Sequence, residues 1–69
     1  MPDETTVVSE ALRTLSPTHL EILRETVLRG CTVNEAAAAL AIPVGTVKSR
    51  VYYALRALRL ALAERGVLP

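Results

Sequence analysis

The residue types best suited to chemistry lie in the last third of the chain and form one basic face. If the residues from about Val44 onward form an α-helix, successive side chains lie roughly 100° apart around its axis. The side chains that lie between about 100° and 240° from Val47 around this axis include no acid. Basic side chains neutralise phosphates, and tyrosines contact phosphates or thymine methyl groups. The pattern favours nucleic-acid binding over the mixed-charge face of an ordinary bundle helix. The residues of this face are Lys48, Ser49, Tyr52, Tyr53, Arg56 and Arg59.

Catalytic and metal chemistry lack the residues that they need. The sequence has one cysteine, Cys31, and one histidine, His19, whereas a protein zinc site takes three or four ligands. No base is paired with a nucleophile, and no glycine-rich loop is present to hold a phosphate. We therefore predict no catalytic residue, no metal, no cofactor and no small-molecule substrate. Cys31 is expected to be a packed or half-exposed thiol, and His19 a surface residue.

Size and charge distribution limit the function classes further. With 69 residues the chain is long enough for one small domain. Hydrophobic residues make up 51% of the sequence, include no Phe or Trp, and are mostly Ala and Leu, a composition that favours helices. Residues 1–35 hold three basic and six acidic residues, a net charge of −3, whereas residues 36–69 hold five basic residues and one acidic residue, a net charge of +4. A basic second half predicts a polyanionic partner.

The sequence also predicts a cytoplasmic protein without membrane insertion. Its longest apolar run, residues 36–42, is far shorter than the ~20 residues of a membrane span. The N-terminus is acidic and has no apolar segment of the kind that a secretory signal contains. A free thiol agrees with a reducing compartment.

Capping signals divide the chain into an all-α domain of four helices over residues 7–66, after a flexible tail at residues 1–6. Apolar spacing predicts a first helix over residues 7–15. Ser16-Pro17 begins a second helix, which carries Leu20, Leu23, Val27 and Leu28 inward and ends at Gly30. Thr32-Val33-Asn34-Glu35 is a capping box that opens a third helix to Leu40. A fourth helix runs from about residue 44 to residue 65, with Val47, Val51, Leu55, Leu58 and Leu62 on its apolar side.

The third and fourth helices have the layout of a helix-turn-helix unit without wing elements. A short helix containing Ala36 and Ala37 is followed by a three-residue break, Ala41-Ile42-Pro43, and then by the long basic helix. Small residues allow the two helices to cross closely. A plain αα-hairpin needs the same positions, so periodicity alone leaves both readings open.

Three segments together resemble region 4 of a bacterial extracytoplasmic-function sigma factor of the sigma-70 family. They are Ala11-Leu12-Arg13-Thr14-Leu15-Ser16-Pro17, Gly30-Cys31-Thr32-Val33-Asn34-Glu35-Ala36-Ala37 and Ile42-Pro43-Val44-Gly45-Thr46-Val47-Lys48-Ser49-Arg50. The resemblance implies recognition of the double-stranded −35 promoter element by a domain docked on the β-flap of RNA polymerase core, and docking of an anti-sigma factor. By position, the DNA-contact residues that it implies are Thr46, Lys48, Ser49, Arg50, Tyr52, Tyr53 and Arg56.

The same resemblance leads to further expectations. The N-terminal amides of the third helix, at Thr32, Val33 and Asn34, should lie near a DNA phosphate. Region 2, which precedes region 4 in such proteins, is missing, so we expect a piece of a longer sigma factor. The chain departs from the family's pattern at Ala41, where a glycine is common, at Pro43, where a serine is common, and at Tyr53-Ala54-Leu55, where Arg-Ala-Arg is common.

Two other functions remain open from the sequence. The output domain of a LuxR-type dimeric regulator also has a Thr-Val-Lys helix after a capped short helix, although the Leu-Ser-Pro entry and Ser49-Arg50 fit it less well. A helical protein-interaction module is the second alternative. Its candidate contact residues, which would equally serve an anti-sigma partner, are Leu12, Leu15, Ile22 and Leu60.

Overall fold

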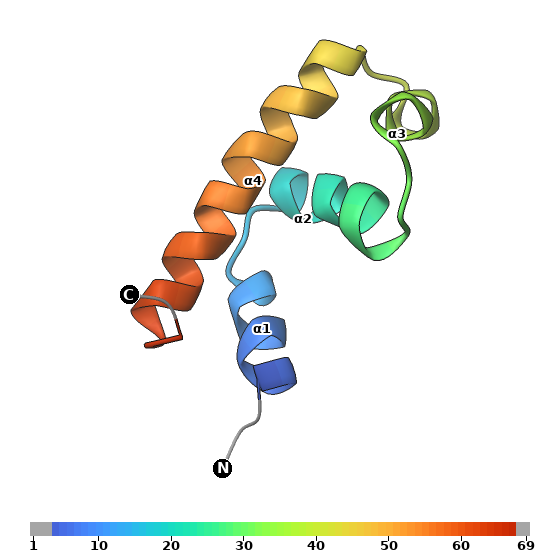
Figure 1. Cartoon of the computed structure of the whole chain (residues 1–69). Helices are drawn as coiled ribbons and strands as arrows, with labels where there is room; N and C mark the ends of the chain where they lie inside the picture. The colour runs from blue at the N-terminus through green and yellow to red at the C-terminus, as the bar shows by residue number, and fades with distance from the viewer. Residues whose placement is uncertain (1–3, 68–69) are drawn as a thin grey trace.

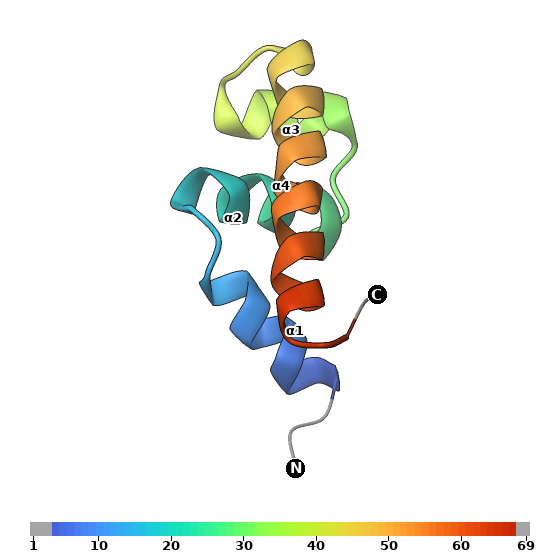
Figure 2. The same ribbon diagram turned by 90° about the vertical axis from the view of Figure 1, so that its left-hand side faces the viewer.

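One long helix organises the computed structural model, which describes residues 4–67. The elements are α1 (Glu4–Arg13), α2 (Pro17–Leu23) continued by the π-helical segment η1 (Arg24–Leu28), α3 (Val33–Leu40) and α4 (Val44–Glu64). Within those residues there is no β-strand, so the predicted all-α class is confirmed. Helix α4 runs along the whole molecule, with α3 near its N-terminal end and α1 near its C-terminal end (Figures 1 and 2). No helix in residues 4–67 is long and apolar enough to cross a membrane.

The core lies where α2, α3 and the first half of α4 meet. Ile22 and Val47 are its largest fully buried side chains, and Ala36 and Ala54 are also fully buried. Alanines at these positions let the helix backbones approach closely, so that little volume needs to be filled. None of the buried side chains in the described part of the chain is polar or charged.

The buried line of α4 differs from the predicted apolar side. Val47, Ala54 and Ala61 are buried, whereas Leu55 is 46% exposed. Two of the four alanines of α4, Ala54 and Ala61, are buried, so the centre of the buried side is shifted away from the leucines. The predicted inward placement of Leu55 is therefore wrong.

The first two helices also differ from the prediction. Helix α1 begins at Glu4, so residues 4–6 belong to the helix and not to a tail, while residues 1–3 lie outside the described residues. An acidic and polar sequence suits a first helical turn because its free N–H groups carry partial positive charge. After α2, the chain widens into η1, in which the Arg29 N–H donates to the Arg24 carbonyl over 2.9 Å. The sequence carries no signal that predicts this π-helical turn.

The two predicted N-terminal caps and the break before α4 are present. Ser16 caps α2 by accepting from the His19 N–H, and Thr32 caps α3 within a complete capping box. Ala41 ends α3 in the left-handed region, with φ 56° and ψ 44°. Pro43 precedes α4 and makes no side-chain cap, but its carbonyl accepts from the N–H groups of Thr46 and Val47. This short turn sets the direction in which α4 leaves α3.

Replacing Ala41 by glycine should stabilise the fold. A residue with a Cβ loses roughly 1–2 kcal/mol in the left-handed region, while glycine adds roughly 0.5–1 kcal/mol of unfolded-state entropy. We expect Ala41→Gly to raise the free energy of unfolding by about 0.5–1 kcal/mol, measured by urea denaturation. Ala39→Gly, at an exposed position inside α3, is the matched control and should lower it by about 1 kcal/mol. Equal losses in both variants would contradict the assigned strain.

Candidate nucleic-acid interface

The side of α4 that faces away from the core is basic and open to solvent. Val47 and Ala54 point into the core, so side chains about half a turn away from them point outward. No other helix in residues 4–67 covers this side (Figure 2). The only acid among residues 44–64 is Glu64, at the C-terminal end. The exposed residues of this outward face are Lys48, Ser49, Tyr52, Tyr53, Arg56 and Arg59.

The predicted DNA-contact residues do not all share that face. Thr46 and Arg50 are only half-exposed, and they lie toward the flank of α4 nearer the core. Helical periodicity did not include Arg50 among the residues of the basic face, and the position of Arg50 in the structure agrees with that prediction. Arg59 is exposed, as Arg56 is, but it was left out of the predicted DNA-contact residues. The spacing of the basic residues along α4 places Arg59 on the same face and could have identified it as a DNA-contact residue.

The N-terminus of α3 is less available to a phosphate than the sequence indicated. The Thr32 N–H donates to Glu35 Oε1 over 2.8 Å, and Thr32 Oγ1 accepts from the Glu35 N–H over 3.1 Å. The Thr32 amide is therefore already used, and a carboxylate stands where the phosphate was expected. This arrangement disfavours the phosphate contact predicted for the Thr32 amide, and that contact stays a prediction. The amides of Val33 and Asn34 make no hydrogen bond within residues 4–67 and remain candidates.

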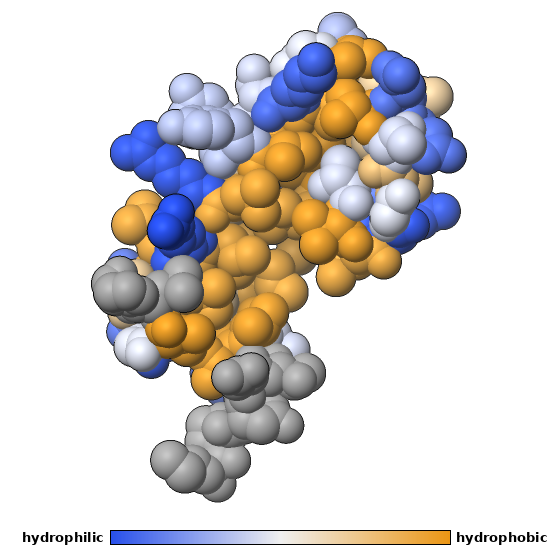
Figure 3. Space-filling model, in the orientation of Figure 1, coloured by the Kyte–Doolittle hydropathy of each residue, from blue (hydrophilic) through white to orange (hydrophobic). Residues whose placement is uncertain are grey.

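An apolar groove runs between α4, α1 and η1. Leu28 is 64% exposed and Val27 is 59% exposed, although both were predicted to point inward. They do point toward the other helices, but α1 does not reach far enough to cover them, so the groove stays open. Figure 3 shows the resulting apolar surface along α4. The groove is lined by Val8, Leu12, Leu23, Val27, Leu28, Leu55 and Leu58.

The predicted protein-contact residues fall into three places. Leu12 lines the apolar groove. Leu15 and Leu60 line a second hollow, between the α1–α2 turn and the end of α4, and Leu60 is 60% exposed. Ile22 is fully buried in the core, so it cannot contact a partner, and that prediction is wrong.

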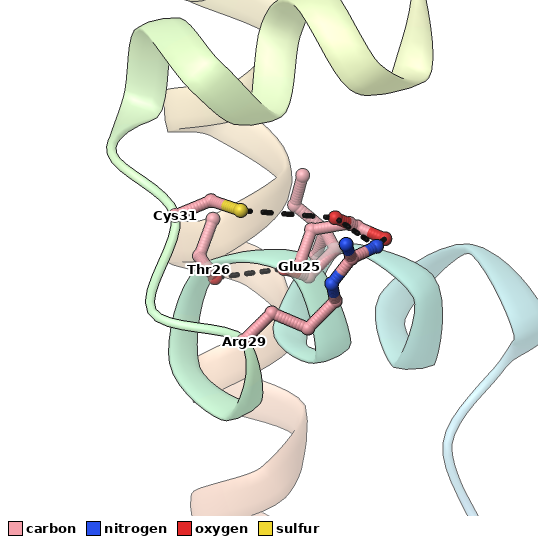
Figure 4. A network of polar contacts seen from close by, with 5 residues as sticks. Glu25, Thr26, Arg29 and Cys31 are labelled. Carbon is pink, nitrogen blue, oxygen red and sulfur yellow. Dashed lines mark hydrogen bonds and ion pairs between the residues drawn. The ribbon is translucent and has the colours of Figure 1, made fainter.

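Cys31 and His19 do not share a site. Figure 4 shows Cys31 beside Glu25, with Sγ 3.9 Å from Oε2, while Arg29 holds the same carboxylate over 3.1 Å. These contacts join the start of η1 to the loop that precedes α3. His19 lines the second hollow. Residues 4–67 contain no group of three His, Cys, Asp or Glu side chains placed to hold a metal.

A capped short helix, a tight turn and a long basic helix define a helix-turn-helix domain. Residues 11–60 match the model of the family described as Sigma-70, region 4. Over 61 residues the chain is 44% identical to the "ECF RNA polymerase sigma factor SigL" of three strains of Mycobacterium tuberculosis, covering 88% of this chain and 34% of each relative. The chain belongs to the sigma-70 region 4 family, which decides against the LuxR-type alternative. It spans about a third of the length of these curated relatives.

The capping box should make folding stability depend on pH. The hydrogen bond from the Thr32 N–H, and then that from the Thr32 side chain, hold the pKa of Glu35 below its ordinary value of 4.5. The stabilisation from the charged carboxylate is therefore complete above pH 4.5 and is lost as the pH falls through the lower folded-state pKa. Glu35→Gln should lower the free energy of unfolding at neutral pH, and its difference from the native chain should shrink under acid.

Urea denaturation between pH 3 and pH 7 measures this difference, and Glu21→Gln is the control. Glu21 is an exposed α2 residue whose side chain makes no hydrogen bond in the described part of the chain. A constant difference for Glu35→Gln across the whole pH range would show that the charge of Glu35 plays no part.

Proposed function

We propose that this chain recognises the −35 promoter element as region 4 of an extracytoplasmic-function RNA polymerase sigma factor. The observation that carries the proposal is the outward face of α4, which is basic and uncovered in a chain of the sigma-70 region 4 family. The relatives of Mycobacterium tuberculosis carry the name of such a sigma factor. In this role the protein works in the cytoplasm, as a binding domain without catalytic residues.

The first turns of α4 enter the major groove. A helix fits that groove, and in helix-turn-helix proteins the N-terminal residues of the second helix contact base edges. Lys48 and Ser49 are the leading base contacts, with Tyr52 and Tyr53 one turn further along α4. Arg56 binds the phosphate backbone. Thr46 and Arg50, nearer the core, contact the backbone at the edge of the groove.

The amides of Val33 and Asn34 offer one further backbone contact. They stand at the N-terminus of α3, where the helix dipole favours an anion. Because Glu35 places a carboxylate beside them, this contact is weaker than an uncapped N-terminus would provide.

Docking on RNA polymerase compensates for weak DNA binding. A single module of this kind buries about 600–1,000 Å² on DNA, and α4 brings few cations to it. Tethering raises the effective concentration of the domain at the promoter without any new DNA contact. The apolar groove, which includes Leu12, is the surface for the β-flap of polymerase, since exposed apolar surface of this kind marks a protein contact. The second hollow, with Leu15 and Leu60, is the surface for an anti-sigma factor.

Two classes of substitution in α4 should affect DNA binding differently. Lys48→Ala and Ser49→Ala should each cost about 1–3 kcal/mol on the preferred site and relax the preference at one base pair. Arg56→Ala should weaken all sequences alike and reduce the slope of log affinity against log salt by about 0.9. In-vitro selection of random duplexes at low salt, followed by salt titration of the selected site, separates the two effects.

The selected site itself tests the proposal. A short site without two-fold symmetry supports region 4, and a palindrome would instead indicate a dimeric regulator. If all three variants lost affinity uniformly over all sequences, the assignment of α4 to the major groove would be wrong.

Removing an apolar side chain from the groove should separate polymerase binding from DNA binding. We expect Leu28→Ser to weaken binding to RNA polymerase core by about 1–2 kcal/mol, because a buried leucine contributes about that much at an interface. Its affinity for the selected duplex should not change. Leu60→Ser, at a similarly exposed leucine in the second hollow, is the matched control and should keep both. Loss of polymerase binding in Leu60→Ser alone would move the β-flap contact to the second hollow.

A further inference from the structure

Tyr52 and Tyr53 form an ordered aromatic pair on the surface of α4. Their ring centroids lie 5.2 Å apart and their planes meet at 87°. This edge-to-face arrangement is one that aromatic rings prefer. Tyr52 is 61% exposed and Tyr53 is 55% exposed, so no core contact holds either ring in place. Each ring therefore restricts the orientation of the other while both remain open to a partner.

The two tyrosines point in different directions from the axis of α4. Tyr52 is two residues before buried Ala54 and thus points almost directly away from the core, whereas Tyr53 adjoins Ala54 and lies on the flank. Ser49 precedes the two rings by three and four residues, so the three side chains share one face. Gly45 has no side chain, and a Cβ placed on it would have no atom within 4 Å. The surface of α4 one turn before Ser49 is therefore open to solvent, and the two tyrosine rings project further from the helix axis than this surface does.

The major groove offers one apolar group that suits such a pair. Every A·T base pair presents the thymine C5-methyl group there, beside polar base edges. Lys48 and Arg56 stand one turn before and one turn after Tyr52 and can neutralise the phosphates on either side.

We propose that Tyr52 and Tyr53 select thymine at one position of the bound site. The ring of Tyr52 contacts the thymine methyl group, and Tyr53 is a positioning residue that holds Tyr52 in the required orientation. The inference rests on the proposed function and adds to it the base that the third turn of α4 recognises.

A protein partner is the other class of ligand that an exposed tyrosine pair would suit. DNA is favoured because the neighbours of the pair on the outward face are Lys48, Ser49 and Arg56, whereas the apolar groove opens on another side of α4. Tyr52 also borders a shallow hollow with Leu55, Arg56 and Arg59, and the two guanidinium groups make that hollow more suitable for phosphate than for an apolar side chain.

The test uses the 69-residue chain and the duplex obtained by selection. Thymidines are replaced one at a time by deoxyuridine, which removes only the methyl group, and the dissociation constant is measured by fluorescence anisotropy at low salt. We expect one position at which the replacement weakens binding about fourfold, as the loss of one buried methyl group would. Tyr52→Ala should abolish that ratio, and Tyr53→Ala should reduce it toward one.

Conservative and remote variants keep the test specific. Tyr52→Phe and Tyr53→Phe retain the ring pair and should retain the fourfold ratio. Thr18→Ala removes an exposed side chain from α2 and should change neither the affinity nor the ratio. Both tyrosines are exposed, so all variants should keep the helical circular dichroism of the native chain.

Each other outcome has a definite meaning. A duplex bound without sensitivity to deoxyuridine at any position overturns this inference and leaves the proposed function standing. Equal weakening of the thymidine and deoxyuridine duplexes by Tyr52→Ala assigns the ring to the sugar-phosphate backbone and also overturns it. Unchanged duplex binding in the alanine variants assigns the pair to a protein partner. Failure of the native chain to bind any duplex overturns the proposed function together with the inference.

Discussion

The close packing of α4 against α2 and α3 determines which side chains of α4 face the solvent. Val47 and Ala54 have no exposed surface, and they pack in one cluster with Ile22 and Ala36. At 3.6 residues per turn, burial of two positions seven residues apart leaves the helix no freedom to rotate about its axis. Lys48, Ser49 and Tyr52 must then face outward. A larger residue at Ala54 would push α2 away and turn the outward face with it, so the interface depends on a methyl group that never contacts a ligand.

The same packing explains why one helix borders two surfaces of opposite character. A core built largely from alanines brings the backbones close but covers little of the leucine-rich side of α4. Small domains bury a smaller fraction of their surface than large ones, and here Val8, Val27, Leu28 and Leu55 stay exposed along the apolar groove. Leu55 lies at the boundary, with the groove on one side and the basic outward face on the other. The two surfaces lie on different sides of α4, so the proposed DNA and polymerase contacts do not compete for the same residues.

Local chemistry explains which features the sequence predicted. The caps at Ser16 and Thr32, the break at residues 41–43 and the basic face of α4 depend on a few neighbouring residues, and all were predicted. The burial of Ile22 and the exposure of Leu28 and Leu55 depend on how far one helix reaches over another, which periodicity does not encode. The use of the Thr32 amide by Glu35 was implicit in the capping box, since the carboxylate that completes the box also occupies the anion position. The roles of the outward residues in binding remain predictions.

The small number of cations on α4 determines how the proposed complex can discriminate between sequences. Each neutralised phosphate contributes a slope of about −0.9 to log affinity against log salt. If Arg50, Arg56 and Arg59 each neutralise one phosphate, a fourfold rise in salt costs roughly 40-fold in affinity, against roughly 10³-fold to 10⁵-fold for proteins with six to ten such contacts. A larger share of the binding free energy then comes from Ser49 and the two tyrosines, which depend on the base sequence and little on salt. In the proposed complex, the domain would hold non-specific DNA weakly and would rely on its docking partner for local concentration.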